Sequence, residues 1–171
     1  MNNLTITETR QYLTFKLNGE IFGVDVAQVR EILDYIKITK VPQTPEFMCG
    51  VINLRGSVVP VVDMNLKFGM PQIEKSVDTC IVVVEVNMND STIIIGALVD
   101  SVQEVFEIEP QNIEPAPKIG TKLKTDFIKG MGKQDDRFII ILDIDKIFSS
   151  DELESVQTGK NENVNAIPVD D

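Results

Sequence analysis

The chain contains no histidine and no tryptophan, and only two of its 171 residues are cysteines. Without histidine, the commonest general base and the commonest metal ligand are missing, so a Ser-His-Asp or Cys-His catalytic site cannot be built. The cysteines, Cys49 and Cys80, lie far apart in apolar stretches and form no Cys-x-x-Cys motif. They are expected to be buried, reduced thiols that behave as small hydrophobic residues. We expect no catalytic residue, no metal site and no cofactor.

Basic residues are also scarce, since 16 Lys and Arg stand against 27 Asp and Glu and give a net charge of −11. This sign argues against nucleic acid, because phosphate binding requires Lys and Arg, and against an anionic membrane surface. No apolar run approaches the ~18 residues of a membrane span, and the amino terminus does not resemble a secretory signal. We therefore expect no nucleic-acid partner, no membrane insertion and a cytoplasmic location.

Short strand patterns separated by turn signals dominate the chain. Residues 11–17 alternate between two faces, Asn18-Gly19 is a strong hairpin signal, and residues 21–24 are predicted to form the returning strand. Further runs of strand length cover residues 58–62, 80–86, 92–99 and 138–142. Many short strands with turns between them favour a β-barrel or a β-sandwich.

Helical patterns are sparse. Asp25 is placed to cap a short helical segment in which Val26, Val29, Ile32 and Leu33 recur at helical spacing. Residues 143–156 are predicted to form a second helix, or a strand end followed by a helix. Beyond residue 157 the chain is polar and nearly free of large hydrophobic residues, which is typical of a frayed tail.

An internal repeat is the most informative feature of the sequence. Residues 46–68 align without a gap on residues 126–148 at an offset of 80, and residues 23–33 align on residues 96–106 at an offset of 73. Glycines, charged residues and turn prolines match in the same order in both copies. Two copies of one unit imply two similar β subdomains related by a pseudo-twofold axis. A groove is expected where the copies meet, which is a preferred place for ligands.

The repeat matches Asp63 with Asp143, which raises the hypothesis of an aspartic protease with one carboxylate from each copy. That chemistry requires a glycine two residues after each aspartate, and neither position has one. We favour the interpretation that each aspartate ends a strand and accepts backbone hydrogen bonds from the next turn. The acidic residues near the carboxyl end lack the spacing of a calcium-binding loop. The closely spaced glycines lack the pattern of a phosphate-binding loop.

The segment Gly-Val-Ile-Asn-Leu-Arg-Gly at residues 50–56 predicts a hairpin turn with Arg55 at its tip. Arg55 is either a solvated turn residue or a fixed cation presented to an acidic partner, for which its planar fork is suited. On the predicted helical turn, Val29 and Ile32 share one face, and both core packing and partner contact remain open for them. Their repeat partners, Val102 and Val105, are expected across the groove.

These segments also carry a family resemblance: from about residue 11 to residue 150, the chain resembles the chemotaxis coupling protein (CheW) family. The resemblance rests on four blocks, YLTFKLNGEIFGVDVAQVREIL, ITKVPQTPEFMCGVINLRGSVVPVVDMNLKFG, GALVDSVQEVFEI and FIKGMGKQDDRFIIILDIDKIF. It implies a mostly β fold of two five-stranded, SH3-like barrels with short helices. It also implies a non-catalytic adaptor that joins methyl-accepting chemoreceptors to a sensor histidine kinase, in cytoplasmic arrays at the inner membrane.

The resemblance suggests how the chain divides. Residues 1–150 would form a CheW-like domain, with a first barrel at about 17–78 and a second at about 79–148. The strand at 11–16 would join the second barrel, as it does in the family, and residues 151–171 would form a polar tail. A related scaffold module that serves a non-chemotaxis kinase pathway would carry the same features, and this alternative stays open.

Two sites follow from the resemblance. The family's signature turn, whose arginine and glycine matter for complex assembly with the kinase, corresponds to Gly50, Asn53, Leu54, Arg55 and Gly56. The groove that takes the helical hairpin tip of the receptor corresponds to Val29, Glu31 and Ile32, bordered from the second copy by Val99 and Val102. Arg30 replaces the usual glutamine of this motif, which leaves the apolar contacts intact and bears on receptor preference.

Overall fold

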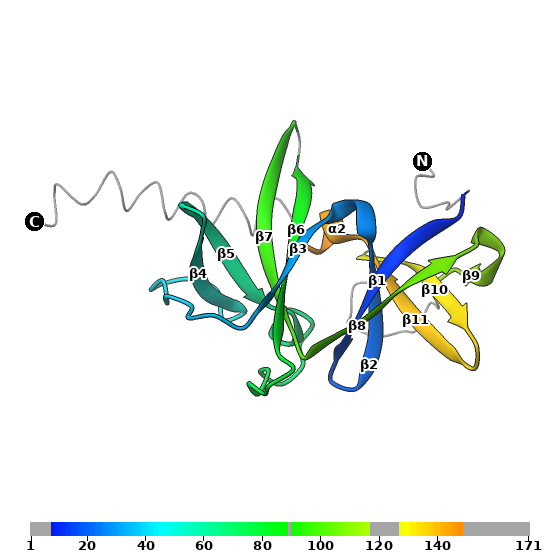
Figure 1. Cartoon of the computed structure of the whole chain (residues 1–171), viewed down its shortest axis with the longest axis horizontal. Coiled ribbons are helices and arrows are strands. Elements are labelled where there is room, and N and C mark those ends of the chain that lie inside the picture. The colour runs from blue at the N-terminus through cyan, green and yellow to red at the C-terminus, as the bar shows by residue number, and fades with distance from the viewer. Residues whose placement is uncertain (1–7, 89, 117–126, 149–171) are drawn as a thin grey trace, which may run out of the picture.

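The structure, a computed structural model, describes residues 8–88, 90–116 and 127–148. Its strands form two sheets that lie side by side (Figure 1). The first subdomain is the five-stranded sheet β3-β6-β7-β5-β4 with helix α1, and the second subdomain is the six-stranded sheet β8-β1-β2-β11-β10-β9 with helix α2. The mostly β architecture with short helices that the sequence predicts is confirmed.

The elements of the first subdomain are β3 (Val29–Asp34), β4 (Met48–Leu54), β5 (Ser57–Asp63), α1 (Met64–Lys67), β6 (Cys80–Met88) and β7 (Ser91–Val99). Those of the second are β1 (Arg10–Leu17), β2 (Glu20–Asp25), β8 (Ser101–Ile108), β9 (Ile113–Glu114), β10 (Ile128–Gln134), β11 (Arg137–Leu142) and α2 (Ile144–Ile147). Two short 3-10 turns, η1 (Val26–Gln28) and η2 (Pro110–Asn112), connect strands. The expected tail at 151–171 lies outside the described residues.

The sheets follow the expected boundaries only in part: β1 joins the second barrel, as expected for the strand at 11–16, but the division into 17–78 and 79–148 does not hold. Both strands of the β1–β2 hairpin belong to the second subdomain, where β1 pairs with β8 and β2 pairs with β11. Conversely, the β6–β7 hairpin belongs to the first, where it pairs with β3 and β5. The chain therefore exchanges one hairpin between its two halves, and only hydrogen bonding between distant strands reveals this exchange.

The internal repeat is confirmed by the register of the sheets. In the first subdomain β5 runs parallel to β7, and Val61 lies opposite Gly96. In the second, β11 runs parallel to β2, and Ile141 lies opposite Gly23. These pairs are related by the two offsets read from the sequence, 80 residues for the valine and isoleucine and 73 for the glycines. The same strand pairing thus recurs in both subdomains.

Gly50 and Gly130, which the repeat matches, lie where a second stretch of backbone crosses the strand. A Cβ atom added to Gly50 would lie 2.1 Å from the carbonyl oxygen of Thr39, and one added to Gly130 would lie 3.0 Å from that of Glu114. Gly50 also has a φ of +145°. Its role is therefore close backbone approach inside the barrel, away from the surface of the turn to which the sequence assigned it.

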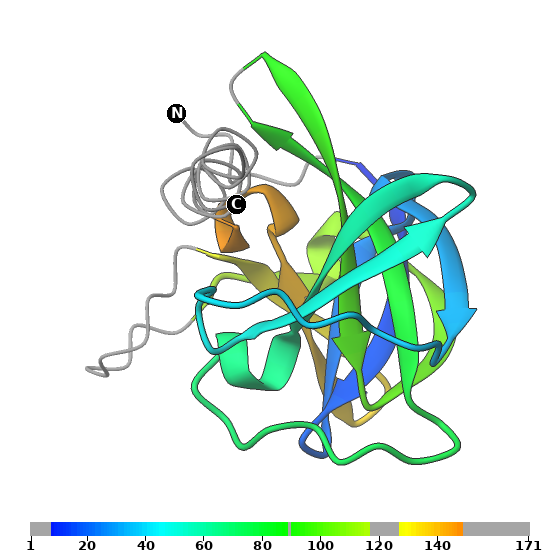
Figure 2. The same cartoon turned by 90° about the vertical axis from the view of Figure 1, so that its left-hand side faces the viewer.

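Three apolar cores hold the fold together. The central core lies between the two sheets and takes residues from both, including Phe15 and Phe22 of the second subdomain and Val82 of the first. A smaller core serves each sheet separately. A row of stacked rings, Phe15, Phe22, Phe68 and Phe127, crosses the junction with centroid separations of 4.9 to 6.2 Å. The strands of both sheets are strongly curled, as the view from the end of the molecule shows (Figure 2).

The helical segment predicted after Asp25 is only partly correct. Asp25 does cap a turn, because its carboxylate accepts a hydrogen bond of 2.9 Å from the backbone N–H of Ala27, but that turn ends at Gln28. Val29 to Asp34 form strand β3, paired with β6. β-Branched residues fit a strand well, and the apolar run of β6 supplies backbone partners that a short helix would lack. After Asp143 a helix does form, but it ends at Ile147.

Asp63 and Asp143 serve as strand-ending caps. Asp63 is only 2% exposed, and its two oxygens accept hydrogen bonds of 3.1 Å from the backbone N–H groups of Leu66 and Ile73. Asp143 accepts one of 3.2 Å from the N–H of Asp145. Both carboxylates are engaged with the turn that follows them, which favours the structural interpretation over the protease hypothesis.

Replacing Gly50 with alanine should lower the free energy of unfolding by about 3 kcal/mol, because the new methyl group adds steric overlap to the cost of the unusual φ. Gly19→Ala is the matched control, since Gly19 has a φ of +86° but no atom within 4 Å of its added Cβ. That change should cost only about 1 kcal/mol. Urea unfolding measures both, and equal losses would contradict the close approach.

Candidate partner-binding surfaces

The turn between β4 and β5 presents Arg55 at its tip, as the sequence predicts. Arg55 and Gly56 have φ values of +50° and +86°, the left-handed pair typical of a tight hairpin. Asn53 secures the turn, because its side-chain oxygen accepts a hydrogen bond of 2.8 Å from the N–H of Gly56. Leu54 instead packs against the core of the first subdomain. The Arg55 side chain is 71% exposed.

Arg55 forms a two-pronged ion pair with Glu31 of β3. Its Nη1 donates to Oε1 of Glu31 at 3.3 Å, and its Nη2 contacts Oε2. This hydrogen bonding lowers the pKa of Glu31 below its ordinary value and raises that of Arg55. The predicted assembly turn and the predicted receptor groove therefore meet in space. The guanidinium is neither a simple solvated group nor an unoccupied cation, since it already binds a carboxylate of its own chain.

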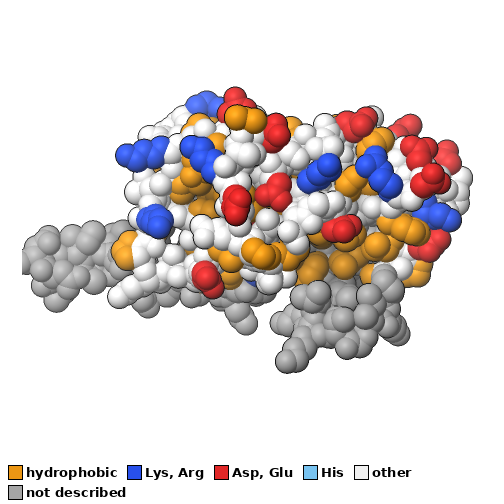
Figure 3. Space-filling model, turned by 90° about the horizontal axis from the view of Figure 1, so that it is seen from below, with side chains coloured by type: hydrophobic (Ala, Val, Ile, Leu, Met, Phe, Trp, Pro, Cys, Tyr) orange, Lys and Arg blue, Asp and Glu red, His pale blue; other side chains and the backbone are white. Residues whose placement is uncertain are grey.

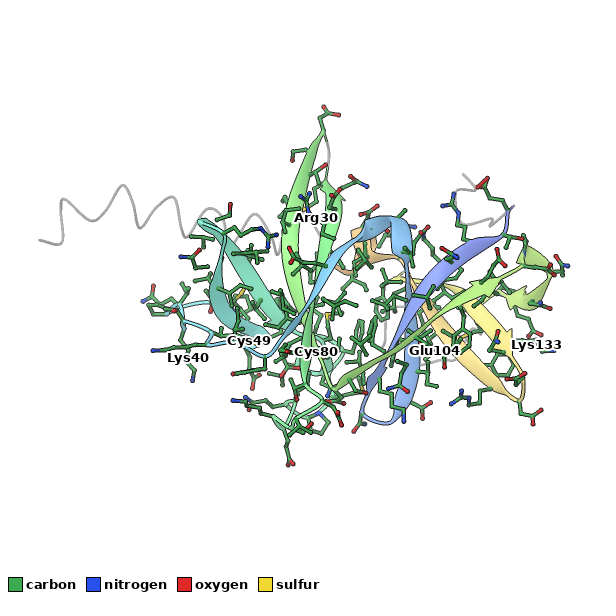
Figure 4. The ribbon with its side chains drawn as sticks, in the orientation of Figure 1. Arg30, Lys40, Cys49, Cys80, Glu104 and Lys133 are labelled. Carbon is green, nitrogen blue, oxygen red and sulfur yellow. The ribbon has the colours of Figure 1, made fainter. Side chains whose placement is uncertain are left out.

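Arg30, which precedes Glu31 on β3, makes a second exposed ion pair. Its Nη1 lies 2.7 Å from Oε2 of Glu85 on β6. Arg30 also contributes to the lowered pKa of Glu31 through its charge, although less than Arg55 does. Strand β3 thus carries one member of each of two ion pairs at adjacent positions, and Arg30 is labelled in Figure 4.

The predicted groove residues lie at three different depths. Ile32 is 45% exposed, whereas Val29 and Val102 are half-buried and pack on the central core. Val99 has no exposed surface and belongs to that core. Its expected place on the rim of the groove does not agree with this burial, because Val99 ends β7 with its side chain directed between the sheets. Val102, three residues later on β8, reaches the border of the core.

Four exposed hydrophobic residues fall at equivalent positions of the repeat. Ile32 and Val105 are related by the offset of 73, and their exposed fractions are 45% and 48%. Val58 and Phe138 are related by the offset of 80, with 54% and 48%. From the sequence, Ile32 was assigned to the receptor groove and Val105 was expected across it as its repeat partner, whereas Val58 and Phe138 were assigned to no site. The repeat alignment could have identified these two as well, since both copies place an apolar residue at the same outward strand position.

The two copies differ in charge at the hairpin tip. The position of Arg55 in the first copy is taken by Asp135 in the second, and Asp135 has a left-handed φ of +58°. The position of Glu31 is taken by Glu104, which is exposed on β8 and labelled in Figure 4. In Figure 3, basic side chains gather at the left end of the face and acidic ones are most numerous at the right, with hydrophobic side chains gathered over the second subdomain. The charge therefore differs between the two hairpin tips but is the same at the two glutamate positions.

Comparison with known proteins decides the family. A family model described as a CheW-like domain matches residues 11–152. The chain belongs to the CheW family.

Relatives and a solved structure agree with this assignment. The chain is 34% identical to the chemotaxis protein CheW of Klebsiella aerogenes over 147 residues, covering 86% of each chain. It is 32% identical to that of Bacillus subtilis over 144 residues, covering 84% of this chain and 89% of the relative. The crystal structure of the scaffolding protein TtCheW from Thermoanaerobacter tengcongensis matches with a TM-score of 0.74 and 38% identity, over 84% of this chain and 94% of the other. The expected pair of SH3-like subdomains is confirmed.

The signature turn of this CheW-family chain is separate from a cavity of about 440 Å³ in the first subdomain. That cavity lies between the loop after β3, helix α1 and the loop before β6. Cys49 forms part of its wall, and burial raises the pKa of its thiol to about 12. None of the predicted site residues lines it.

Within residues 8–88, 90–116 and 127–148, no group of three or more His, Cys, Asp and Glu side chains could hold a metal ion. In the same part of the chain, no helix is long and apolar enough to cross a membrane.

Replacing Arg55 with glutamine should raise the pKa of Glu31 toward its ordinary value, because the hydrogen bonds that favour the carboxylate are lost. In the wild type the lowered pKa stabilises the fold above the unfolded pKa, and that contribution is lost as the pH falls through the folded value. NMR titration of the Glu31 side chain measures the shift. Arg30→Gln is the control, and it should raise the pKa less. A larger rise in the control would contradict the ion pair.

Replacing Val99 with threonine should cost about 1–3 kcal/mol of stability, because a hydroxyl would be buried in the central core without a partner. Val105→Thr makes the same chemical change at an exposed position and should stay within about 0.5 kcal/mol of the wild type. Chemical unfolding compares them. If Val99→Thr were as mild as Val105→Thr, Val99 would be accessible, and its assignment to the groove would stand.

Proposed function

We propose that this chain is a non-catalytic adaptor of a chemotaxis system, which couples methyl-accepting chemoreceptors to the regulatory domain of a sensor histidine kinase. Its membership of the CheW family supports this role, as do relatives described as chemotaxis proteins and a neighbour described as a scaffolding protein. One structural observation carries the argument further. The duplication gives a single body two equivalent surfaces, each with exposed hydrophobic residues, and an adaptor needs at least two such surfaces.

The kinase would contact the hairpin tips and the exposed residue three positions after each. On the first subdomain these are Arg55 and Val58, and on the second they are Asp135 and Phe138. A large side chain at the centre of such a surface supplies most of the binding energy, and charge at its edge selects and orients the partner. The opposite charges of Arg55 and Asp135 would let one partner distinguish the two ends. Asn53 and Gly56 shape the first tip, and Gly50 lies on the strand that leads to it.

The receptor would bind between the subdomains. Val29 and Val102 are related by the repeat, and both border the central core, so together they mark the junction of the two sheets. Ile32 extends this border outward beside Glu31. A helical hairpin tip presents apolar side chains at helical spacing, and an apolar groove is the surface that such a helix requires. Because Glu31 binds Arg55, a receptor in the groove would also affect the position of Arg55 in the turn that faces the kinase.

This role needs no chemistry in the adaptor itself. Signalling contacts are often small and transient, so modest affinity is expected for each partner. A signal would pass as a shift between arrangements of the assembled complex. The net charge of −11 opposes binding to nucleic acid. The role implies a cytoplasmic position beside receptor arrays at the inner membrane.

Introducing a charge into the exposed hydrophobic surface should separate the two partners. Phe138→Asp and Val58→Asp should each weaken binding to the purified kinase regulatory domain at least tenfold, because they bury an unpaired carboxylate in the contact. Ile32→Asp should weaken binding to a receptor fragment that carries the hairpin tip. Isothermal titration measures each affinity.

Val77→Asp is the matched control, since Val77 is fully exposed and has no equivalent in the set of four. It should bind both partners as the wild type does. Circular dichroism checks that every variant is folded. If Phe138→Asp and Val58→Asp bound the kinase normally, the kinase surface would be misassigned. Recovery from cells of a kinase from another behavioural system would assign the adaptor to that pathway instead.

A further inference from the structure

The two short helices carry polar residues at equivalent positions of the repeat. Asn65 of α1 and Asp145 of α2 are the second residues of their helices and are related by the offset of 80. Both reach toward a segment that connects the subdomains. In the described ranges the chain passes from one sheet to the other twice, at η1 between β2 and β3 and at Asp100 between β7 and β8.

The first contact, called here the α1 clamp, consists of Asn65, Asp100 and the backbone of Asn18. Oδ2 of Asp100 accepts a hydrogen bond of 2.7 Å from the N–H of Asn18 in the β1–β2 turn. The same oxygen accepts one of 3.5 Å from Nδ2 of Asn65. A helix of the first subdomain is thereby joined to a hairpin of the second through one carboxylate.

The second contact, called here the α2 clamp, consists of Asp145, Gln28 and the backbone of Asn87. Oδ1 of Asp145 accepts hydrogen bonds of 3.0 Å from Nε2 of Gln28 and 2.8 Å from the N–H of Asn87 on β6. Nε2 of Gln28 also donates to the carbonyl oxygen of Glu85 at 3.1 Å. Figure 1 shows α2 beside β6. This clamp joins a helix of the second subdomain to a hairpin of the first.

The two clamps use the same groups in exchanged positions. Each has one carboxylate, one side-chain amide and one backbone N–H from a hairpin of the other subdomain. In the α1 clamp the amide is on the helix and the carboxylate on the connecting segment, whereas in the α2 clamp the carboxylate is on the helix and the amide on the connecting segment. Together they tie the two sheets at both connecting segments.

The clamps are unequal in strength. The side-chain oxygen of Asn65 is buried and has no hydrogen-bond partner among the described residues, and the whole residue is only 4% exposed. Its amide nitrogen makes one bond, which at 3.5 Å is at the limit of hydrogen-bond length. A buried polar group left unpaired favours any arrangement that pairs it or returns it to water. In the α2 clamp, every hydrogen bond is 3.1 Å or shorter.

We propose that the two clamps set the angle between the subdomains. The α1 clamp is the weaker one and acts as a latch, which opens when the angle changes. The α2 clamp acts as the pivot of this movement. The consequence for binding rests on the proposed function, because the receptor groove lies at this junction. A change of angle would move Val29 and Val102 relative to each other and so alter the shape offered to the receptor tip.

Residual dipolar couplings of the backbone amides in the free protein test the latch, since they report the relative orientation of the two sheets. Asn65→Asp places two carboxylates together, and Asp100→Asn removes the acceptor charge, so each should change the orientation. The double variant Asn65→Asp with Asp100→Asn reproduces the arrangement of the α2 clamp and should restore it. Asp136→Asn, an exposed residue outside both clamps, is the control and should change nothing.

Asn65→Leu keeps the test decisive if Asn65→Asp does not fold. This change removes the unpaired oxygen and the hydrogen bond to Asp100 without adding charge. The protein should therefore stay folded, and the relative orientation of the two sheets should still change. Couplings identical to the wild type in Asn65→Leu and Asp100→Asn would overturn the latch, whatever partner binds. If the couplings change, a several-fold change in affinity for the receptor fragment is expected, with recovery in the double variant. Changed couplings with unchanged affinity would refute only the link to the receptor groove.

Discussion

Burial of the central core between the two sheets is the constraint on which the other features depend. Neither sheet covers its inner face alone, because Phe15 and Phe22 come from one subdomain and Val82 comes from the other. Burying such side chains contributes about 1.5–3 kcal/mol each, so the two halves gain most of their stability only as a pair. The hairpin exchange has the same effect, because each half of the chain contributes one hairpin to the sheet of the other half. A single body with two faces results.

Duplication explains how one small body comes to offer two related surfaces. The strand pairing recurs at offsets of 73 and 80 residues, so outward positions recur as well, and Ile32 and Val58 reappear as Val105 and Phe138. The copies have kept this geometry while their charges have diverged, with an arginine at one hairpin tip and an aspartate at the other. Equal shape with unequal charge is what an adaptor requires in order to hold distinct partners in a defined order.

In the part of the chain that the structure describes, the aspartates close to the cores are engaged in holding turns and connecting segments. Asp63 and Asp143 cap the turns after their strands, and Asp100 and Asp145 tie the subdomains together. The exception among the buried side-chain atoms described is the oxygen of Asn65. Because nearby polar contacts are otherwise satisfied, this one unpaired group marks the place where the junction between the subdomains is least secured.

Much of this protein can be read from the sequence, because duplication leaves matched glycines, aspartates and hairpin turns at constant offsets. The β class, the two similar subdomains, the exposed Arg55 turn and the capping aspartates all depend on local patterns of this kind. How deeply each valine is buried does not depend on a local pattern. Val99 and Val102 look alike in sequence, and their different burial is decided by where the two sheets meet. The exchange of hairpins, the pairing of Arg55 with Glu31 and the strand at Val29 also escaped local patterns. They arise from contacts between segments far apart in the chain, and only the tertiary structure decides which of the available partners each segment finds.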